Sequence, residues 1–189
     1  MRNDRDLIAK ILGSGSERAL TQLVRRHEQS TFNLVYRILM DQEEAEEVAQ
    51  DAFLQSFKEL HGLQDWSKYK SWLLTIAYRK AIDKVRLKKR ITTELTNLDT
   101  QQGKFLNPPD IVEKMQQIRL KQELELLMDK LSELDRGLIT LFYLEEFNIP
   151  AVADATGLTE SNVKIRLMRA RTFLKKELEK RHLTKEDLY

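Results

Sequence analysis

The sequence predicts an all-α protein made of two small helical domains joined by a flexible linker, the C-terminal one containing a helix-turn-helix. The 189 residues include only six glycines and three prolines, and the helix formers Leu, Glu, Lys, Arg and Ala dominate. Apolar residues recur at helical spacing through most of the chain. That pattern stops between residues 91 and 117, where threonines, a glycine and the pair Pro108-Pro109 predict a linker. We therefore expect domains at residues 1–90 and 118–189.

Composition excludes several classes of function. The chain has no cysteine, which excludes disulfide bonds, thiolate metal sites and a cysteine nucleophile. Three scattered histidines indicate no metal site, and we expect no cofactor. No nucleophile–histidine pair, phosphate-binding glycine loop or cleft of carboxylates is evident, so the chain is not expected to be an enzyme. The N-terminus lacks a signal-peptide core and no window approaches a membrane span, which predicts a cytoplasmic protein without direct membrane insertion.

The N-terminal domain is expected to hold four helices. Their predicted bounds are residues 4–12, 17–40, 42–60 and about 67–90. Ser16 and Asp41 are the predicted N-caps of the second and third helices, and Asp65 or Ser67 caps the fourth. His27 falls beside the buried stripe of the second helix, where a packing role is a better interpretation than a ligand role.

Charge is segregated although the net charge is only +2. Residues 41–51 hold six acids and no base. Residues 66–90 hold nine bases and one acid, and residues 161–181 hold eight bases and two acids. Acids in a first helical turn favour the helix dipole, which accounts for Glu43 and Glu44 but not for Glu47 and Asp51 further along. This segregation suggests separate surfaces for separate partners.

The basic stretch at residues 66–90 also contains both tryptophans, Trp66 and Trp72. Basic charge interleaved with aromatic rings suits a surface that binds phosphates and stacks on exposed bases. The alternative is a core helix with a solvated basic face, since charge runs are usually solvated.

The C-terminal part carries the pattern of a helix-turn-helix. After helices at residues 118–131 and from Ser132 onward, Asn148 caps a short helix, residues 149–156. A turn at residues 157–159 leads to a long basic helix from Glu160 to about Arg181. In this last helix, residues at helical spacing are expected to pack inward: Val163, Leu167, Ala170 and Leu174. The residues expected to face outward near its N-terminal half are Ser161, Asn162, Lys164, Ile165, Arg166, Met168 and Arg169. The alternative is an αα-hairpin with a solvated basic face.

Three stretches in this order resemble a known family. They are AEEVAQDAFLQSFKEL at residues 45–60, YKSWLLTIAYRKAIDKVRLKKR at residues 69–90 and NIPAVADATGLTESNVKIRLMRARTFLKKEL at residues 148–178. Together they resemble an extracytoplasmic-function (group IV) RNA polymerase sigma factor of the sigma-70 family. The resemblance implies that residues 1–90 form the region 2 domain, which binds the core polymerase and melts the minus-ten element. Residues 118–189 would form the region 4 domain, which reads the minus-thirty-five element.

The resemblance also implies partners and site residues. The partners are the RNA polymerase core, through its β′ clamp helices and β flap, promoter DNA and an anti-sigma factor, in a stress or envelope response. The implied core-binding residues are Glu47, Gln50, Asp51 and Leu54. The implied minus-ten residues are Trp72, Arg79, Lys80, Lys84, Arg86, Lys88 and Lys89. The implied minus-thirty-five residues are Ser161, Asn162, Lys164, Arg166, Arg169 and Arg171.

The sequence departs from the family pattern in three places. Glu47 begins the core-binding motif, where an aspartate is more common. Arg79 stands where an asparagine is usual, near the pocket that receives an unstacked minus-ten base, so a phosphate contact is an alternative role. Ile149-Pro150-Ala151 replaces a run that is commonly Tyr-Glu-Glu-like. Two other functions remain open at this point. One is a stand-alone helix-turn-helix regulator that binds duplex DNA without polymerase, and the other is an adaptor that binds polymerase or RNA only.

Overall fold

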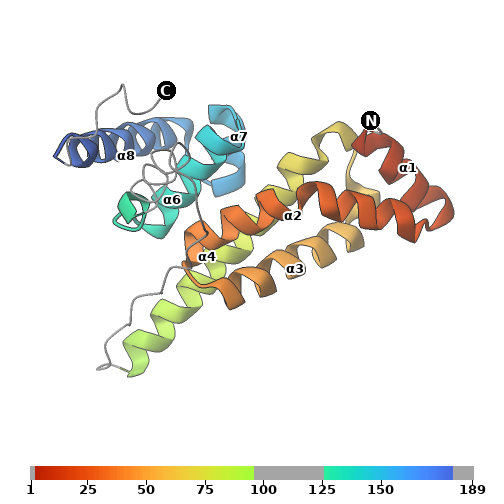
Figure 1. The fold of residues 1–189 in the computed structure, drawn as a ribbon, viewed down its shortest axis with the longest axis horizontal. Helices are drawn as coiled ribbons and strands as arrows, with labels where there is room; N and C mark the ends of the chain where they lie inside the picture. Colours follow the sequence, from red (N-terminus) through yellow and green to blue (C-terminus); the bar gives the residue numbers. More distant parts are fainter. Residues whose placement is uncertain (1–2, 96–125, 181–189) are drawn as a thin grey trace, which may run out of the picture.

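Every regular element in the described part of the computed structural model is helical, and the described residues are 3–95 and 126–180. The N-terminal unit consists of α1 (Asp4–Ser14), α2 (Glu17–Leu39), α3 (Gln42–Lys58), the 3-10 turns η1 (Leu60–Gly62) and η2 (Trp66–Lys68), and α4 (Tyr69–Leu95). The C-terminal unit contains α6 (Glu133–Ile139), the π-helical turn η3 (Thr140–Leu144), α7 (Ile149–Thr156) and α8 (Glu160–Lys180). Figure 1 shows α2, α3 and α4 packed together, with α6, α7 and α8 on one side of them. The all-α prediction is confirmed.

The local signals for helix starts are confirmed. The side chains of Ser16, Asp41 and Asn148 each accept a hydrogen bond from the backbone N–H three residues later, and Thr159 does the same for Asn162. Asp65 caps η2, which leads directly into α4. These caps satisfy backbone donors that have no partner within their own helix.

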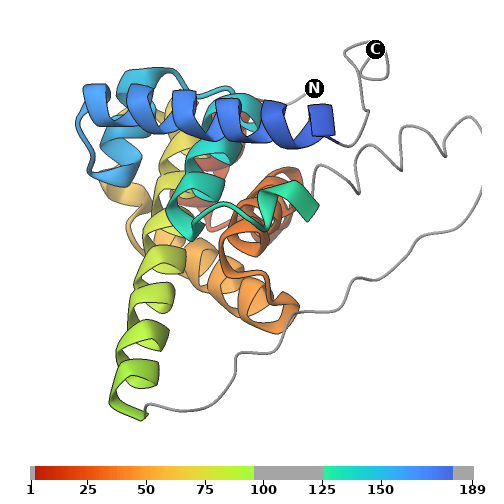
Figure 2. The same cartoon turned by 90° about the vertical axis from the view of Figure 1, so that its left-hand side faces the viewer.

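The expected helix ends lie within two residues of the observed ones, with one larger difference. Helix α4 continues to Leu95, past the linker start expected at residue 91. Figure 2 shows α4 projecting well beyond the rest of the helices. The remainder of the expected linker, and most of the helix expected at residues 118–131, lie outside the described residues.

The core of the N-terminal unit lies between α2, α3 and the first half of α4. Tyr69, at the start of α4, is fully buried, and its hydroxyl lies 3.0 Å from the hydroxyl of Ser56 in α3. Burial raises the pKa of Tyr69 to about 12. Leu73, Leu74 and Ala77 continue this buried face. The first two turns of α4 are therefore anchored in the core, as the sequence predicts.

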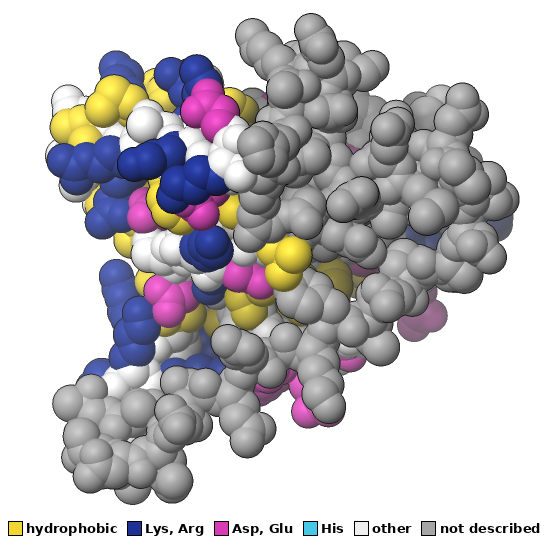
Figure 3. Space-filling view, turned by 60° about the vertical axis from the view of Figure 1, so that its left-hand side comes forward, with side chains coloured by type: hydrophobic (Ala, Val, Ile, Leu, Met, Phe, Trp, Pro, Cys, Tyr) yellow, Lys and Arg dark blue, Asp and Glu magenta, His cyan; other side chains and the backbone are white. Residues whose placement is uncertain are grey.

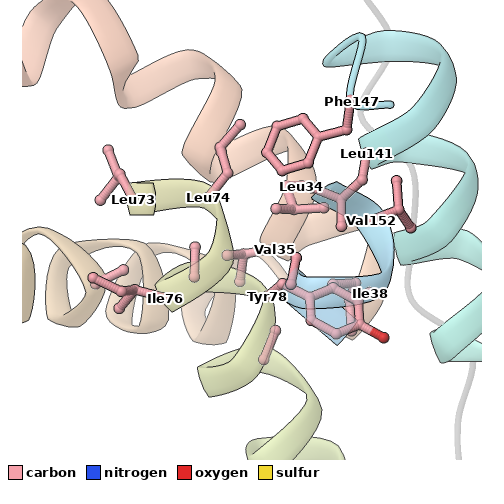
Figure 4. Close-up of a cluster of buried hydrophobic side chains, with 14 of the residues drawn as sticks. Leu34, Val35, Ile38, Leu73, Leu74, Ile76, Tyr78, Leu141, Phe147 and Val152 are labelled. Atoms are coloured by element: carbon pink, nitrogen blue, oxygen red, sulfur yellow. The ribbon is translucent and has the colours of Figure 1, made fainter. Parts of the chain in front are cut away.

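The two units share one continuous apolar core. Figure 4 shows Leu34, Val35 and Ile38 of α2 beside Leu141, Phe147 and Val152 of the C-terminal unit. All six side chains belong to one buried cluster, together with Tyr78 of α4. The linker therefore joins units that are docked against each other in the free chain.

His27 is a buried packing residue, as expected, but it also has a polar partner. Its Nε2 lies 2.9 Å from the Asp4 carboxylate, which tethers α1 to α2. Burial lowers the pKa of His27 from the ordinary value of 6.5, although Asp4 opposes this shift by favouring the charged ring. Of these two effects, the loss of hydration on burial is the larger.

The free energy of unfolding is expected to fall as the pH drops below about 6.5. The lowered pKa means that the unfolded chain binds a proton on His27 more readily than the folded chain does, so acid favours unfolding. Melting temperatures measured between pH 8 and pH 5.5 check this. An Asp4→Asn variant should show a steeper fall, because the carboxylate that favours the charged ring is gone. A shallower fall in that variant would contradict the assignment.

Candidate nucleic-acid interface

Three ion pairs join the acidic edge of α3 to the basic edge of α4. Lys84 Nζ lies 2.7 Å from the Glu47 carboxylate, Lys88 Nζ lies 2.5 Å from Glu44, and Lys80 Nζ lies 3.9 Å from Asp51. We call these three pairs the ion-pair ladder. The acidic and basic stretches meet at this edge, because the antiparallel helices α3 and α4 place their charges side by side.

The ladder is exposed enough for its partners to be exchanged. The side chains of Glu47 and Asp51 are 62% and 57% exposed, so both remain accessible to another protein. The hydrogen bond from Lys84 to Glu47 raises the pKa of Lys84. Exposed ion pairs of this kind contribute only about 0.2–1 kcal/mol each, so a charged partner can replace one at small cost.

The four implied core-binding residues share one exposed face of α3. Glu47, Gln50, Asp51 and Leu54 stand at i, i+3, i+4 and i+7, and all four are exposed. We call them the α3 face. Leu54 is 51% exposed although α3 buries apolar residues on its other side. An exposed large apolar side chain beside acids on one helix face is a typical composition for a protein–protein contact.

The implied minus-ten residues on α4 fall into two groups. Lys80 and Lys84 lie in the middle of the helix and pair with α3 in the ladder. Arg86, Lys88 and Lys89 lie on the projecting half of the helix with exposed side chains, and Lys88 also belongs to the ladder. The Arg86 guanidinium donates to the carboxylate of Asp83 in the same helix, at 3.2 Å. Lys89 reaches Glu133 of α6 at 3.1 Å. The projecting half of α4 therefore offers a cationic surface.

Trp72 is partly buried and packs against Tyr69, with the ring centroids 6.2 Å apart. It belongs to the margin of the core and also reaches solvent. This position is compatible with both interpretations of Trp72, a packing residue and a stacking platform.

The Arg79 guanidinium donates hydrogen bonds to the C-terminal unit. Its Nη2 donates to the backbone carbonyl of Asp154 at 2.8 Å, and its Nε donates to that of Ala155 at 3.2 Å. Both carbonyls belong to the last turn of α7. The residue that departs from the family pattern thus joins the predicted melting helix to the helix-turn-helix.

The helix-turn-helix forms as expected from α7, a turn at Gly157 and α8. Gly157 adopts a left-handed conformation with φ 71°, which ends α7. Val163, Leu167 and Ala170 are buried and Leu174 is partly buried, so the predicted inward face of α8 is confirmed. Figure 3 shows Lys and Arg side chains gathered with hydrophobic ones over the part of the surface formed by α7 and α8.

Not every implied minus-thirty-five residue points outward. Ser161, Asn162, Lys164, Arg169 and Arg171 are exposed. Arg166 instead turns toward α6, where its Nη1 donates to the Asp135 carboxylate at 2.7 Å. The expectation that Arg166 faces outward is wrong, because Asp135 near the start of α6 is a closer partner.

Two apolar residues stand near the centre of the outward face of α8. Ile165 is 44% exposed and Met168 is 54% exposed. With Ser161 and Thr172 they stand opposite the buried stripe, at i, i+4, i+7 and i+11. The sequence predicts that both face outward, but neither is among the implied minus-thirty-five residues, which are all charged or polar. Their position on the outward face of the helix was the signal that could have identified them.

No helix in the described part of the chain is long and apolar enough to cross a membrane. The same residues contain no cluster of three or more His, Cys, Asp or Glu side chains suited to a metal ion.

Comparisons with known proteins match both halves of the chain. The family model of Sigma-70 region 2 matches residues 23–91, and that of Sigma-70 region 4 matches residues 121–174. The chain is 32% identical over 151 residues to the "ECF RNA polymerase sigma factor SigM" of Bacillus subtilis, covering 78% of this chain and 90% of SigM. It is 26% identical over 178 residues to SigW of the same organism, covering 89% of this chain and 94% of SigW.

Two solved structures share the fold over most of the chain. CnrH, in complex with the cytosolic domain of CnrY, is 25% identical with a TM-score of 0.61, covering 93% of this chain and 97% of CnrH. The sigma factor RpoE of Bartonella quintana, in complex with the anti-sigma factor NepR, is 19% identical with a TM-score of 0.70. That similarity covers 84% of this chain and 96% of RpoE.

Proposed function

This chain belongs to the extracytoplasmic-function group of the sigma-70 family of RNA polymerase sigma factors. We propose that its α3 face, α4 and α8 each perform a different step of transcription initiation. The α3 face binds the polymerase core, α4 captures the minus-ten element, and α8 reads the minus-thirty-five element. The chain itself makes no bond, because catalysis belongs to the polymerase, and it acts where the polymerase is, in the cytoplasm. The supporting observation is that one chain presents an exposed acidic and apolar helix face, a basic aromatic helix and a helix-turn-helix in the family's order.

The core contact rests on the chemistry of the α3 face. Glu47 and Asp51 offer carboxylates to a basic clamp, and Leu54, one turn beyond Asp51, offers an apolar anchor. Lys84 is paired with Glu47, and Lys80 with Asp51. When a cation of the clamp binds one of these acids, its lysine becomes available to bind promoter phosphates. Core binding therefore prepares α4 for DNA.

Promoter opening uses binding energy alone. Stacking of a base on an aromatic side chain contributes about 1–3 kcal/mol, and extruding a base from a duplex costs a few kcal/mol. Captured minus-ten bases thus offset much of the cost of melting, with Trp72 as the candidate platform. Arg86, Lys88 and Lys89 hold the strand by its phosphates.

Recognition of the minus-thirty-five element places the N-terminal half of α8 in the major groove. Lys164, Arg169 and Arg171 contact phosphates and base edges. Ile165 and Met168 lie where apolar side chains contact thymine methyl groups. The reading face is therefore a mixed one, apolar in the middle and cationic at its borders.

Lys164→Ala and Arg166→Ala are expected to have different effects. Lys164→Ala should weaken binding to all promoter sequences. It should also reduce the slope of log K against log salt concentration by about 0.9, because a single phosphate contact is lost. Arg166→Ala should mainly lower the melting temperature, because its partner is Asp135. Salt titrations of holoenzyme binding, with thermal melts of the free chain, separate the two effects. A change of base preference in Arg166→Ala without loss of stability would contradict this assignment.

The solved relatives also suggest a regulator. CnrH was solved with the cytosolic domain of CnrY, and RpoE with the anti-sigma factor NepR. We propose that an anti-sigma factor likewise binds this chain and that its release belongs to a stress or envelope response.

Binding to duplex DNA with and without polymerase core tests the proposed function against its alternative. Genomic fragments should be retained in a core-dependent way, since region 2 needs the core to engage the promoter. Specific retention of duplex fragments by the chain alone, unchanged by added core, would favour a stand-alone helix-turn-helix regulator.

A further inference from the structure

A pocket of about 190 Å³ lies between the second half of α2 and the start of the C-terminal unit. From the C-terminal unit, its lining includes one residue of α6 and two residues of the segment before α6. It shares no lining residue with the α3 face, α4 or α8. A cavity of about 150 Å³ accommodates benzene, so this pocket has room for a ligand with one aromatic ring.

The apolar walls of the pocket combine flat aromatic rings with flexible thioethers. Phe32 and Tyr36 stand one turn apart on α2, with their ring centroids 5.8 Å apart and their planes inclined by 15°. Met40 and Met128 also line the pocket, and Met128 is almost fully buried. Aromatic rings pack on one another in offset arrangements, and thioether sulfurs contact ring edges favourably. These walls suit a flat aromatic ligand.

Met40 has an unusual backbone conformation for its residue type. It follows the last residue of α2 with φ 56°, in the left-handed region where glycine is the common residue at a helix end. Methionine costs more than glycine in this conformation, which indicates that its side chain has a use there. That use fits its place in the pocket wall.

The polar part of the lining has a net positive charge. Arg37 and Arg136 supply two cations and Asp129 one anion, so the formal charge is +1. Neither arginine forms an ion pair with another residue in the described part of the chain.

Arg136 is a buried cation whose charge is incompletely balanced. It is 7% exposed, and within the described residues its guanidinium donates to backbone carbonyls alone, which leaves Nε without a partner. Burial lowers the pKa of Arg136, and the nearby carboxylates of Glu133 and Asp129 oppose this shift only in part. Burying a charge without an ionic partner is costly, so an anion in the pocket would stabilise this part of the fold.

We propose that this pocket binds a small aromatic carboxylate with a single ring. The ring lies against the aromatic and thioether walls, and the carboxylate faces Arg37 and Arg136. A monoanion balances the formal charge of the lining, whereas a phosphate dianion exceeds it. Asn33 also lines the pocket, and its Oδ1 accepts a hydrogen bond from Gln29 at 2.8 Å, which leaves its amide N–H groups as donors for the ligand.

Titration of the full chain with 4-fluorobenzoate, followed by the fluorine NMR signal of the ligand, tests the site. Saturable one-to-one binding is expected, and the melting temperature should rise with ligand concentration because the ligand binds the folded chain. The neutral analogue 4-fluorobenzamide has nearly the same shape. It should bind at least about tenfold more weakly, because hydrogen bonds to a charged group are lost.

Arg37→Met tests the cationic wall, and Arg25→Met is its matched control. Arg37 is preferred to Arg136 for this test, because Arg136 also holds α6 to the carbonyl of Ile38. Arg37→Met should weaken the binding of 4-fluorobenzoate about tenfold. Arg25 is exposed on the same helix outside the pocket, so Arg25→Met removes the same charge and should leave the affinity unchanged.

Met40→Gly separates a role in binding from a role in folding. Glycine suits φ 56°, so the melting temperature of the ligand-free chain should be unchanged or higher. The affinity for 4-fluorobenzoate should nevertheless fall several-fold, because part of the wall is removed. An unchanged affinity in this variant would contradict the place of Met40 in the site.

The proposed site would be overturned by any of three results. The first is the absence of saturable binding below about 10 mM ligand. The second is equal affinity for 4-fluorobenzoate and 4-fluorobenzamide, which would indicate an apolar cavity without recognition of an anion. The third is equal affinity in the Arg37→Met and Arg25→Met chains. These titrations contain neither polymerase nor DNA, so they do not depend on the proposed sigma activity.

Discussion

Replacing Asp51 with arginine is expected to abolish co-elution of the chain with polymerase core. Reversal of one charge in an interface that pairs opposite charges costs about 2–5 kcal/mol or more. The new arginine would also stand beside Lys80, which lies 3.9 Å from the present carboxylate. Because the Asp51 side chain is 57% exposed, the fold should remain intact, with an unchanged circular dichroism spectrum.

Glu46→Arg is the matched control for this experiment. Glu46 is exposed on the same helix outside the α3 face, and its carboxylate accepts a hydrogen bond from Gln42 in the previous turn. The net change in charge is identical in the two variants. If both variants co-elute with the core as the starting chain does, Asp51 is not part of the clamp interface. Equal loss in both would mean that net charge, not the α3 face, governs binding.

Replacing Arg136 with methionine is expected to lower the free energy of unfolding by about 3 kcal/mol. Its guanidinium donates to three backbone carbonyls, those of Asp129, Leu131 and Ile38. Burial lowers the pKa of Arg136 below its ordinary value, which reflects the cost of burying the charge. Methionine keeps much of the volume but leaves these carbonyls without their donor. For a chain of this size the melting temperature should fall by roughly 6–12 °C.

Urea unfolding curves check this prediction, with Arg171→Met as the control. Arg171 is exposed on α8, and surface substitutions away from special contacts usually change stability by less than about 0.5 kcal/mol. Similar midpoints for the two variants would show that Arg136 does not tie the units together.

The features that the sequence predicts well are local ones. An N-cap needs only a short polar side chain at the right offset, so Ser16, Asp41, Asn148 and Thr159 could be identified from their neighbours alone. The inward stripe of α8 follows from helical spacing in the same way. The order of the three motifs then indicated the family, which the comparisons bear out.

The features that the sequence does not predict depend on contacts between distant residues. Arg79 meets the carbonyls of Asp154 and Ala155 only once the C-terminal unit is docked on α4. Arg166 likewise contacts Asp135 only because α8 packs on α6. The ion-pair ladder requires the register of α3 against α4, which no local pattern fixes. Gly137 did carry a local signal, a glycine inside a helical pattern, whose meaning appears only with Tyr78 beside it.

These contacts change the interpretation of the basic helix α4. Its first turns are core, its middle is paired with α3, and Arg79 and Lys89 are engaged by the C-terminal unit. In the free chain, the cations expected to bind the minus-ten element are thus largely occupied. Each of these pairings has to be exchanged for a contact with polymerase or DNA.

Multi-round transcription with purified polymerase core, this chain and genomic DNA fragments tests the sigma assignment most directly. Start sites should appear only when both proteins are present, and they should map downstream of a shared pair of elements near minus thirty-five and minus ten. The chain should also co-elute with the core before DNA is added. Absence of chain-dependent start sites, together with absence of co-elution, would contradict the account.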